Sequence, residues 1–107
     1  AETVKSVTGA PAVLCGDAGL PVRRVALLGG SGSDDVPAAL AAGADTYLSG
    51  ELAYHHLADA REMGINLLAA GHFHTENPVC RTLSRMLAGI DPTLTVDLYD
   101  SNRTTLI

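Results

Sequence analysis

The sequence predicts an α/β fold, with three α/β/α layers built around a largely parallel or mixed sheet. Short apolar runs of strand length alternate with helical patterns of about ten residues, which is typical of βαβ crossovers. The chain of 107 residues is 47% apolar and rich in alanine, which favours close packing of helices on a sheet. No linker or low-complexity tract divides the sequence, so we expect a single domain over residues 1–107.

Four segments have the composition of β-strands. The strongest is Val22–Leu28, because a nearly continuous apolar run is expected of a strand that is covered on both faces. Asp45–Leu48 and Asn66–Ala70 are the next two. Thr93–Tyr99 alternates between polar and apolar residues and is predicted to be the last strand. A further short apolar run covers residues 11–15.

Four helices are predicted between these segments, and three of them end at a glycine, the residue most often found just after a helix. The three cover residues 2–8, run from Val36 to a stop at Gly43, and cover residues 52–63. The fourth is capped by Thr75 or Asn77, carries Pro78 in its first turn and reaches about Leu87.

Charge and composition exclude several classes of protein. The net charge of −5 disfavours direct binding of nucleic acid, which needs a clustered basic face. No run approaches the roughly 20 apolar residues of a membrane span, and residues 1–3 do not begin a signal peptide, so we expect a cytoplasmic protein without a membrane partner. Cys15 and Cys80 lack a metal-binding spacing and are predicted to be reduced core residues. The chain starts with Ala1 rather than Met, as a segment of a longer protein would.

The segment Gly71–Pro78 is the main candidate for a functional site. It places two imidazoles and a carboxylate, from His72, His74 and Glu76, at a predicted strand-to-helix junction. These are ligand types that zinc, manganese and iron accept. His72 and Glu76 would share one face of a helix, whereas all three would share one face of an extended chain. The other interpretation is that Glu76 stabilises a helix start without any metal.

Two neighbouring segments add polar side chains. On the predicted helix over residues 52–63, His55 shares a face with Asp59, which could orient its ring, whereas His56 falls on the apolar stripe and is predicted to lie at the edge of the core. Asp45 and Glu51 are expected to flank the strand end that lies beside the strand carrying His72. Strand ends at this edge of a sheet are where ligands collect.

Gly29–Ser33 is a glycine-rich segment between a predicted strand and a predicted helix, and is expected to form a flexible loop. Backbone N–H groups at such a place can bind an anion. The segment lacks the Lys-Ser/Thr ending of a P-loop and does not fit G-x-G-x-x-G. Two interpretations stay open, a tight turn or a contact with substrate phosphate.

Four segments together resemble the Nif-three-like dinuclear metal-binding family, whose members are often called GTP cyclohydrolase I type 2 homologues. They are Val22–Ser33, Ala41–Glu51, the pair Tyr54-His55, and Ala70–Glu76, in the family's order and spacing. The resemblance implies the Nif-three-like fold. It also implies that the G-H-x-x-x-E motif contributes His72 and Glu76 to a centre of two divalent metal ions, with zinc, manganese or iron as the metal and His74 as a candidate third ligand.

The sequence departs from the family pattern in one respect. Family chains are longer, and their other ligands come from an amino-terminal half with a His-His-Pro motif and an Asp in a His-Thr-Asn-x-Asp segment, neither of which is present here. The chain therefore resembles the carboxy-terminal half of a two-lobed protein. Its expected partners are the missing amino-terminal half or another chain, together with further copies of itself in a homo-oligomer.

Two hypotheses of function follow. In the first, the chain is part of a metal-dependent hydrolase that acts on a nucleotide-like or phosphorylated small molecule, with Glu51 and His55 supporting the ligands or transferring a proton. In the second, it is a non-enzymatic assembly or regulatory module that oligomerises.

Overall fold

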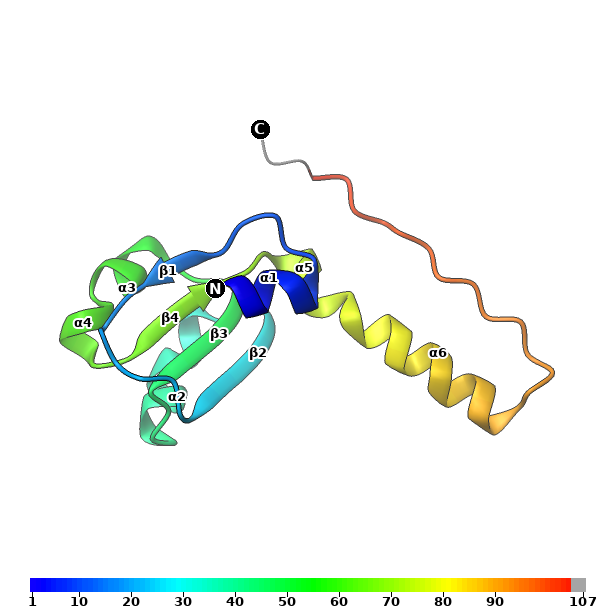
Figure 1. Ribbon diagram of the computed structural model, residues 1–107, viewed down its shortest axis with the longest axis horizontal. Helices are drawn as coiled ribbons and strands as arrows, with labels where there is room; N and C mark the ends of the chain where they lie inside the picture. The colour runs from blue at the N-terminus through cyan, green and yellow to red at the C-terminus, as the bar shows by residue number, and fades with distance from the viewer. Residues whose placement is uncertain (105–107) are drawn as a thin grey trace.

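The computed structural model describes residues 1–104 and consists of a four-stranded sheet with helices around it (Figure 1). The strand order is β1-β4-β3-β2. The parallel strands are β2 (Val25–Ser31), β3 (Thr46–Glu51) and β4 (Asn66–Ala69), and β1 (Leu14–Gly16) pairs antiparallel with β4. The predicted α/β class with a mixed sheet is therefore confirmed.

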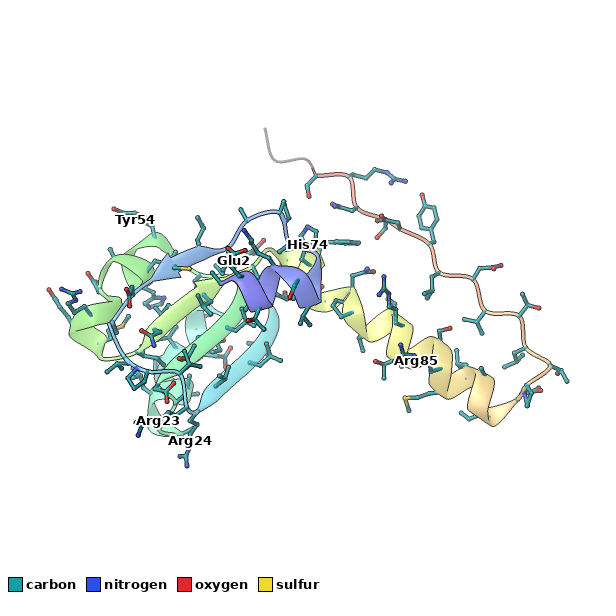
Figure 2. All side chains as sticks on the ribbon, in the orientation of Figure 1. Glu2, Arg23, Arg24, Tyr54, His74 and Arg85 are labelled. Atoms are coloured by element: carbon teal, nitrogen blue, oxygen red, sulfur yellow. The ribbon has the colours of Figure 1, made fainter. Side chains whose placement is uncertain are left out.

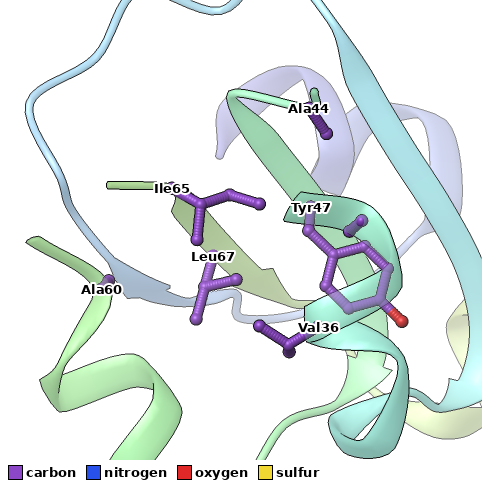
Figure 3. Packing of buried hydrophobic residues seen from close by; sticks show 7 residues of the cluster. Val36, Ala44, Tyr47, Ala60, Ile65 and Leu67 are labelled. Carbon is purple, nitrogen blue, oxygen red and sulfur yellow. The ribbon is translucent and has the colours of Figure 1, made fainter. Parts of the chain in front are cut away.

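The central strand β3 sets the face on which the core forms. Tyr47 is in register with Ala26 of β2 and with Leu67 of β4, so the three side chains lie on one face of the sheet. Three helices cover this face: α2 (Val36–Ala41), α3 (Tyr54–Ala58) and α4 (Ala60–Met63). Figure 3 shows the resulting cluster, in which Tyr47 and Leu67 are at most 2% exposed.

The predicted helix over residues 52–63 is divided into α3 and α4. The break lies at Asp59, whose φ of −92° and ψ of 6° interrupt the helix. Strand β1 passes very close to this part of the chain, because a Cβ on Gly16 would lie 2.5 Å from the carbonyl oxygen of Leu57. Between β2 and α2, a short 3-10 turn covers Ser33–Asp35.

The opposite face of the sheet is exposed along β2, whereas Thr46 of β3 and Asn66 of β4 are buried on it. Val25 and Leu27 of β2 lie on it and are 52% and 69% exposed. Cys15 of β1 shares this face, since it pairs with Leu68, which lies in register with Leu48 and Leu27. The prediction that residues 22–28 are covered on both faces is therefore wrong for this chain. The helix α1 (Glu2–Thr8) ends at Gly9, as predicted, but none of its residues is buried.

Both cysteines are free thiols, as predicted, but neither belongs to the core. Cys15 is exposed on the edge strand β1, and Cys80 lies on α6, which has no buried residue. The prediction that both cysteines are buried is wrong, because apolar neighbours along the chain do not ensure that a residue is buried in the fold.

The predicted loop over residues 29–33 begins later than expected. Gly29, Gly30 and Ser31 continue β2, although the register with β3 shifts between Leu28 and Ser31 and Gly30 adopts a φ of 74°. The glycines therefore extend a strand that a helix approaches closely, rather than forming a free loop.

The carboxyl-terminal part of the chain extends away from the sheet. After α5 (His72–Glu76), the longer helix α6 (Pro78–Ile90) points outward and carries Pro78 in its first turn, as predicted (Figure 1). The prediction of a strand over Thr93–Tyr99 is wrong, because this segment has no regular structure. Its alternating pattern suits a strand, but α6 leads it away from any sheet edge with which its backbone could pair.

Among residues 1–104, no helix combines the length and the apolar character that crossing a membrane requires.

Candidate metal site

The candidate site lies at the carboxyl-terminal ends of the parallel strands, where α5 packs against β2 and β3. Gly71, with a φ of 88°, turns the chain from β4 into α5, so His72 stands at a strand-to-helix junction as predicted. Ser31 ends β2 and Glu51 ends β3, and the two residues are paired across the strands. Figure 2 shows His74 near this end of the sheet and Arg23 and Arg24 at the other end.

His72 lies between two carboxylates. Its Nε2 is 3.3 Å from Oε2 of Glu76, and its Nδ1 is 3.4 Å from Oε1 of Glu51. Each of the three side chains is about half exposed, between 47% and 58%. Since α5 is a helix, the two residues four apart on it share a face, which agrees with the helical interpretation of this segment.

Ser31 holds the other oxygen of Glu51. Its hydroxyl donates a hydrogen bond of 2.6 Å to Oε2. This bond, followed by the contact with His72, lowers the pKa of Glu51 below its ordinary value. Glu51 is therefore ionised at neutral pH.

Gly30 provides the space in which His72 and Glu76 meet. A Cβ at this position would lie 2.5 Å from Oε1 of Glu76 and 3.2 Å from Nε2 of His72. The φ of 74° also lies in the left-handed region that glycine adopts without strain. Any other residue here would enter the space between the imidazole and the carboxylate.

Thr75 fixes α5 on the strands. The N–H of Gly30 donates to Oγ1 of Thr75 at 3.0 Å, and the Thr75 hydroxyl lies 3.1 Å from the carbonyl of Gly71, to which it can donate. Gly50 permits this approach, because a Cβ there would lie 2.6 Å from Thr75 Oγ1 and 2.9 Å from the Cα of His72.

The geometry of Gly29–Ser33 disfavours the interpretation that this segment binds phosphate. The amide of Gly30 already donates to Thr75, and the amide of Gly32 donates to the carbonyl of Glu51 at 3.1 Å. Backbone donors that are satisfied within the fold are not available to an anion. The segment instead serves to bring α5 close to β2.

The distance between His72 and Glu76 suits two ligands of one metal ion. Two ligand atoms that each lie about 2.1 Å from an ion, at roughly 90–110° to each other, are about 3.0–3.4 Å apart. The observed 3.3 Å between Nε2 and Oε2 falls in this range. Over residues 1–104, no group of three or more His, Cys, Asp or Glu side chains is placed to hold a metal ion, so the remaining ligands would have to come from elsewhere.

His74 is not brought together with the His72–Glu76 pair. It follows His72 by two positions on α5, which turns it about 200° around the helix axis. Its ring instead lies against Phe73, with centroids 5.5 Å apart, and it lines a pocket of ≈ 730 Å³. The pocket also touches Glu51 and has apolar walls that include Leu14 and Leu52, so it opens directly beside the site.

Of the two predicted supporting residues, Glu51 contacts His72, whereas among residues 1–104 no ion pair or hydrogen bond joins His55 to His72. The His55 ring of α3 lies 4.2 Å from the His56 ring at an angle of 52°, and in the same residues no hydrogen bond joins its side chain to Asp59 or Glu51. His56 is half-buried, as predicted, and its Nδ1 is buried without a hydrogen-bond partner in the described chain.

The prediction that Asp45 flanks the site is wrong. This residue precedes β3, at the end of the strand opposite Glu51, where its carboxylate accepts hydrogen bonds from the amides of Arg23 and Arg24.

Sequence reasoning did not identify Ser31 and Thr75 as parts of the site. The contact of Ser31 with Glu51 depends on the register between β2 and β3, which no local pattern reveals. The sequence predicts Thr75 only as a helix cap, although its position between His72 and Glu76 is a signal that it belongs to the site.

The chain is similar to known proteins both in sequence and in fold. The profile of the family described as Duf34/NIF3 (NGG1p interacting factor 3) matches residues 1–105. Among curated relatives, proteins named "GTP cyclohydrolase 1 type 2 homolog" are 47% identical over 60 residues in Pseudomonas aeruginosa and 35% identical over 88 residues in Escherichia coli K12. The matches cover 56% and 81% of this chain, but only 24% and 36% of those relatives.

Solved structures of longer chains share the fold. TTHA1606 from Thermus thermophilus has a TM-score of 0.79 and 28% identity, over 97% of this chain and 42% of that one. A Bacillus cereus protein related to NIF3 has a TM-score of 0.72 and 25% identity, over 99% of this chain and 31% of that one. The motif resemblance, the profile match over nearly the whole sequence and the shared fold agree: the chain belongs to the DUF34/NIF3 family.

Proposed function

We propose that this chain supplies His72 and Glu76 to a centre of two divalent metal ions in a hydrolase-like protein. The observation that carries the proposal is the 3.3 Å separation of His72 Nε2 and Glu76 Oε2 on one face of α5. Gly30 supports it, because its missing Cβ leaves the space between these two atoms open. Zinc, manganese and iron are the metals that this combination of ligands suits.

The centre is incomplete within this chain. The chain spans about a quarter to a third of the length of its curated relatives, and two ligands are fewer than a metal site normally uses. We propose that the amino-terminal half of the longer family chain, or a partner chain, provides the others. When bound, divalent ions at such a centre lower the pKa of a coordinated water and polarise the substrate.

The substrate we propose is a small nucleotide-like or phosphorylated molecule. The pocket beside the site carries apolar walls for a ring or chain and has Glu51 and His74 as polar groups at the same cavity. Pockets with mostly apolar walls and a few polar groups are typical of small-molecule sites. The name of the curated relatives refers to GTP, which belongs to this substrate class.

Titration of the purified chain with Zn²⁺ tests the metal site. We expect binding that is lost in His72→Ala and Glu76→Gln. His55→Ala is the matched control, because it removes an exposed imidazole on α3 and should leave binding unchanged. Equal Zn²⁺ binding by the wild type and by both site variants would refute the role of His72 and Glu76.

The hydrolase activity is tested with the chain combined with the amino-terminal half of a family member. Nucleotides are incubated with the metal-loaded complex, and their hydrolysis products are separated by chromatography. We expect turnover that His72→Ala abolishes. Turnover that is identical in the variant would exclude this centre as the catalytic one.

A second proposal, an assembly module, is favoured by the exposed apolar surface of α6. One face of this helix carries five apolar side chains that are between 43% and 78% exposed, those of Val79, Leu83, Met86, Leu87 and Ile90. Such a continuous apolar stripe normally packs against protein. We propose that the amino-terminal half of the longer family chain covers it.

Size-exclusion chromatography with light scattering tests this proposal. The chain is mixed with the amino-terminal half of a family member, and we expect a complex that Leu83→Glu prevents. Arg85→Gln is the control, since it changes the net charge by the same amount on the opposite face of α6. A homo-oligomer that excludes the amino-terminal half would identify a second copy as the occupant of the stripe.

A further inference from the structure

We propose that Glu51, held in place by Ser31, is a positioning residue that accepts a hydrogen bond from Nδ1–H of His72 and leaves Nε2 free to face Glu76. The effect of Glu51 on metal binding rests on the proposed function. The effect of Glu51 on the tautomer of His72 does not, because the position of a ring proton can be observed without any metal.

The geometry provides a separate partner for each nitrogen of His72. Nδ1 faces Oε1 of Glu51 at 3.4 Å, and Nε2 faces Oε2 of Glu76 at 3.3 Å. A neutral imidazole carries its single proton on one nitrogen and has an acceptor lone pair on the other. Only the nitrogen without the proton can bind a metal, so the partner of the other nitrogen decides which one is available.

Glu51 is better fixed than Glu76 to act as the acceptor. Oε2 of Glu51 receives the Ser31 hydroxyl at 2.6 Å, which leaves Oε1 directed at Nδ1. Ser31 and Glu51 are themselves paired in the β2–β3 register, so the carboxylate is anchored to two strands. A carboxylate that receives the second N–H of a ligating histidine fixes both its tautomer and its ring orientation.

Glu76 suits the complementary role. It lies on the same helix as His72, and its Oε1 approaches the backbone at Gly30, where a Cβ would lie 2.5 Å away. Among the residues that the structure describes, no serine or threonine hydroxyl donates to the Glu76 carboxylate as Ser31 does to Glu51. The two carboxylates on either side of one imidazole are therefore not equivalent, and the structure assigns Glu51 to orientation and Glu76 to ligation.

Long-range ¹H–¹⁵N correlation NMR of the histidine rings tests the tautomer. Spectra are recorded on the metal-free chain at a pH where the imidazoles are neutral, and His72 is assigned by its absence in His72→Gln. We expect Glu51→Ala to shift the proton of His72 from Nδ1 towards Nε2. Glu51→Gln should retain more of the Nδ1–H form, because its amide oxygen still accepts a hydrogen bond.

Titration with Zn²⁺ gives the second readout. We expect Glu51→Ala to weaken binding by about 10–100-fold, the usual effect of removing an outer partner of a metal ligand. Ser31→Ala should weaken binding less, and Ser31→Thr, which keeps a hydroxyl, should restore the wild-type value. A purely structural role of Glu51 would lower thermal stability without changing the tautomer.

Two outcomes would overturn the positioning role of Glu51, and a third would overturn the proposed metal site alone. An unchanged tautomer ratio in Glu51→Ala overturns it, whatever the metal affinity. Loss of Zn²⁺ binding in Glu51→Gln as complete as in His72→Ala also overturns it, because Glu51 would then be a ligand. If the wild type binds no Zn²⁺ but the tautomer shifts as expected, the proposed metal site fails and the positioning role of Glu51 stands.

Discussion

Gly30 lies so close to Glu76 that a single added methyl group would lie 2.5 Å from the carboxylate oxygen Oε1. The nearest atom is the end of a flexible side chain, so this carboxylate can move aside. A substitution at Gly30 should therefore change the position of the Glu76 carboxylate more than the rest of the fold.

Gly30→Ala should displace the Glu76 carboxylate from His72. The loss in the free energy of Zn²⁺ binding should exceed the loss in the free energy of unfolding. The positive φ of 74° alone should cost about 1–2 kcal/mol in the free energy of unfolding. Gly89→Ala is the control, because a Cβ in that part of α6 has no atom within 4 Å, and alanine there should stabilise by about 0.5–1 kcal/mol. Calorimetric titration and urea unfolding of both variants check this. Unchanged Zn²⁺ affinity in Gly30→Ala would contradict it.

Tyr47→Phe should lower the free energy of unfolding by about 1 kcal/mol. Tyr47 is 2% exposed, and its hydroxyl donates to the carbonyl of Gly32 at 3.0 Å. The loss in the free energy of unfolding stays moderate because the Gly32 carbonyl keeps a second hydrogen bond, from the amide of Asp35. Urea unfolding measures the change. Tyr54→Phe removes the same hydroxyl from a side chain that is 85% exposed, and an equal loss there would show that burial is not the cause.

Thr93→Val should raise the pKa of Asp91 towards its ordinary value. The Thr93 hydroxyl donates to Oδ1 of Asp91 at 2.7 Å and the Thr93 amide at 2.9 Å, and these bonds lower the pKa of the carboxyl. Because the folded pKa lies below the unfolded one, the stabilisation is present above the unfolded pKa and is lost as the pH falls through the folded pKa. A carbonyl-detected NMR titration checks the shift, and Thr95→Val should leave it unchanged.

Local sequence patterns predicted the parts of the site that lie within one element. His72 and Glu76 are four residues apart, which places them on one face of a helix, so the sequence alone predicts that they meet on α5. Glu51 and Ser31 meet across two strands that are 20 residues apart in sequence, and only the register brings them together. The proposed ligand pair was therefore visible in the sequence, whereas the contacts that orient it were not.

Two errors in the prediction of the fold have a common physical origin. Residues 22–28 and Thr93–Tyr99 both have the composition of strands that are covered by other protein. In this chain the first exposes Val25 and Leu27, and the second pairs with no strand. Composition reflects the surroundings for which a segment is suited, and a local pattern does not show whether those surroundings are present in the fold. This chain spans 24% of one curated relative and 42% of one solved structure that it matches.

Thr75→Val should loosen α5 from β2 and thereby weaken Zn²⁺ binding, although the residue is expected to touch no metal. Valine keeps the shape of the side chain but loses the oxygen that accepts the Gly30 amide at 3.0 Å, which leaves a partly buried N–H without its partner. Such a loss should lower the free energy of unfolding by about 1–3 kcal/mol. Hydrogen exchange of the Gly30 amide measures the local effect, and it should become faster relative to the amides of β3. Thr82→Val on the exposed surface of α6 is the control. If Gly30 exchange and Zn²⁺ affinity both stay at their wild-type values in Thr75→Val, the hydroxyl does not hold the helix that carries His72 and Glu76.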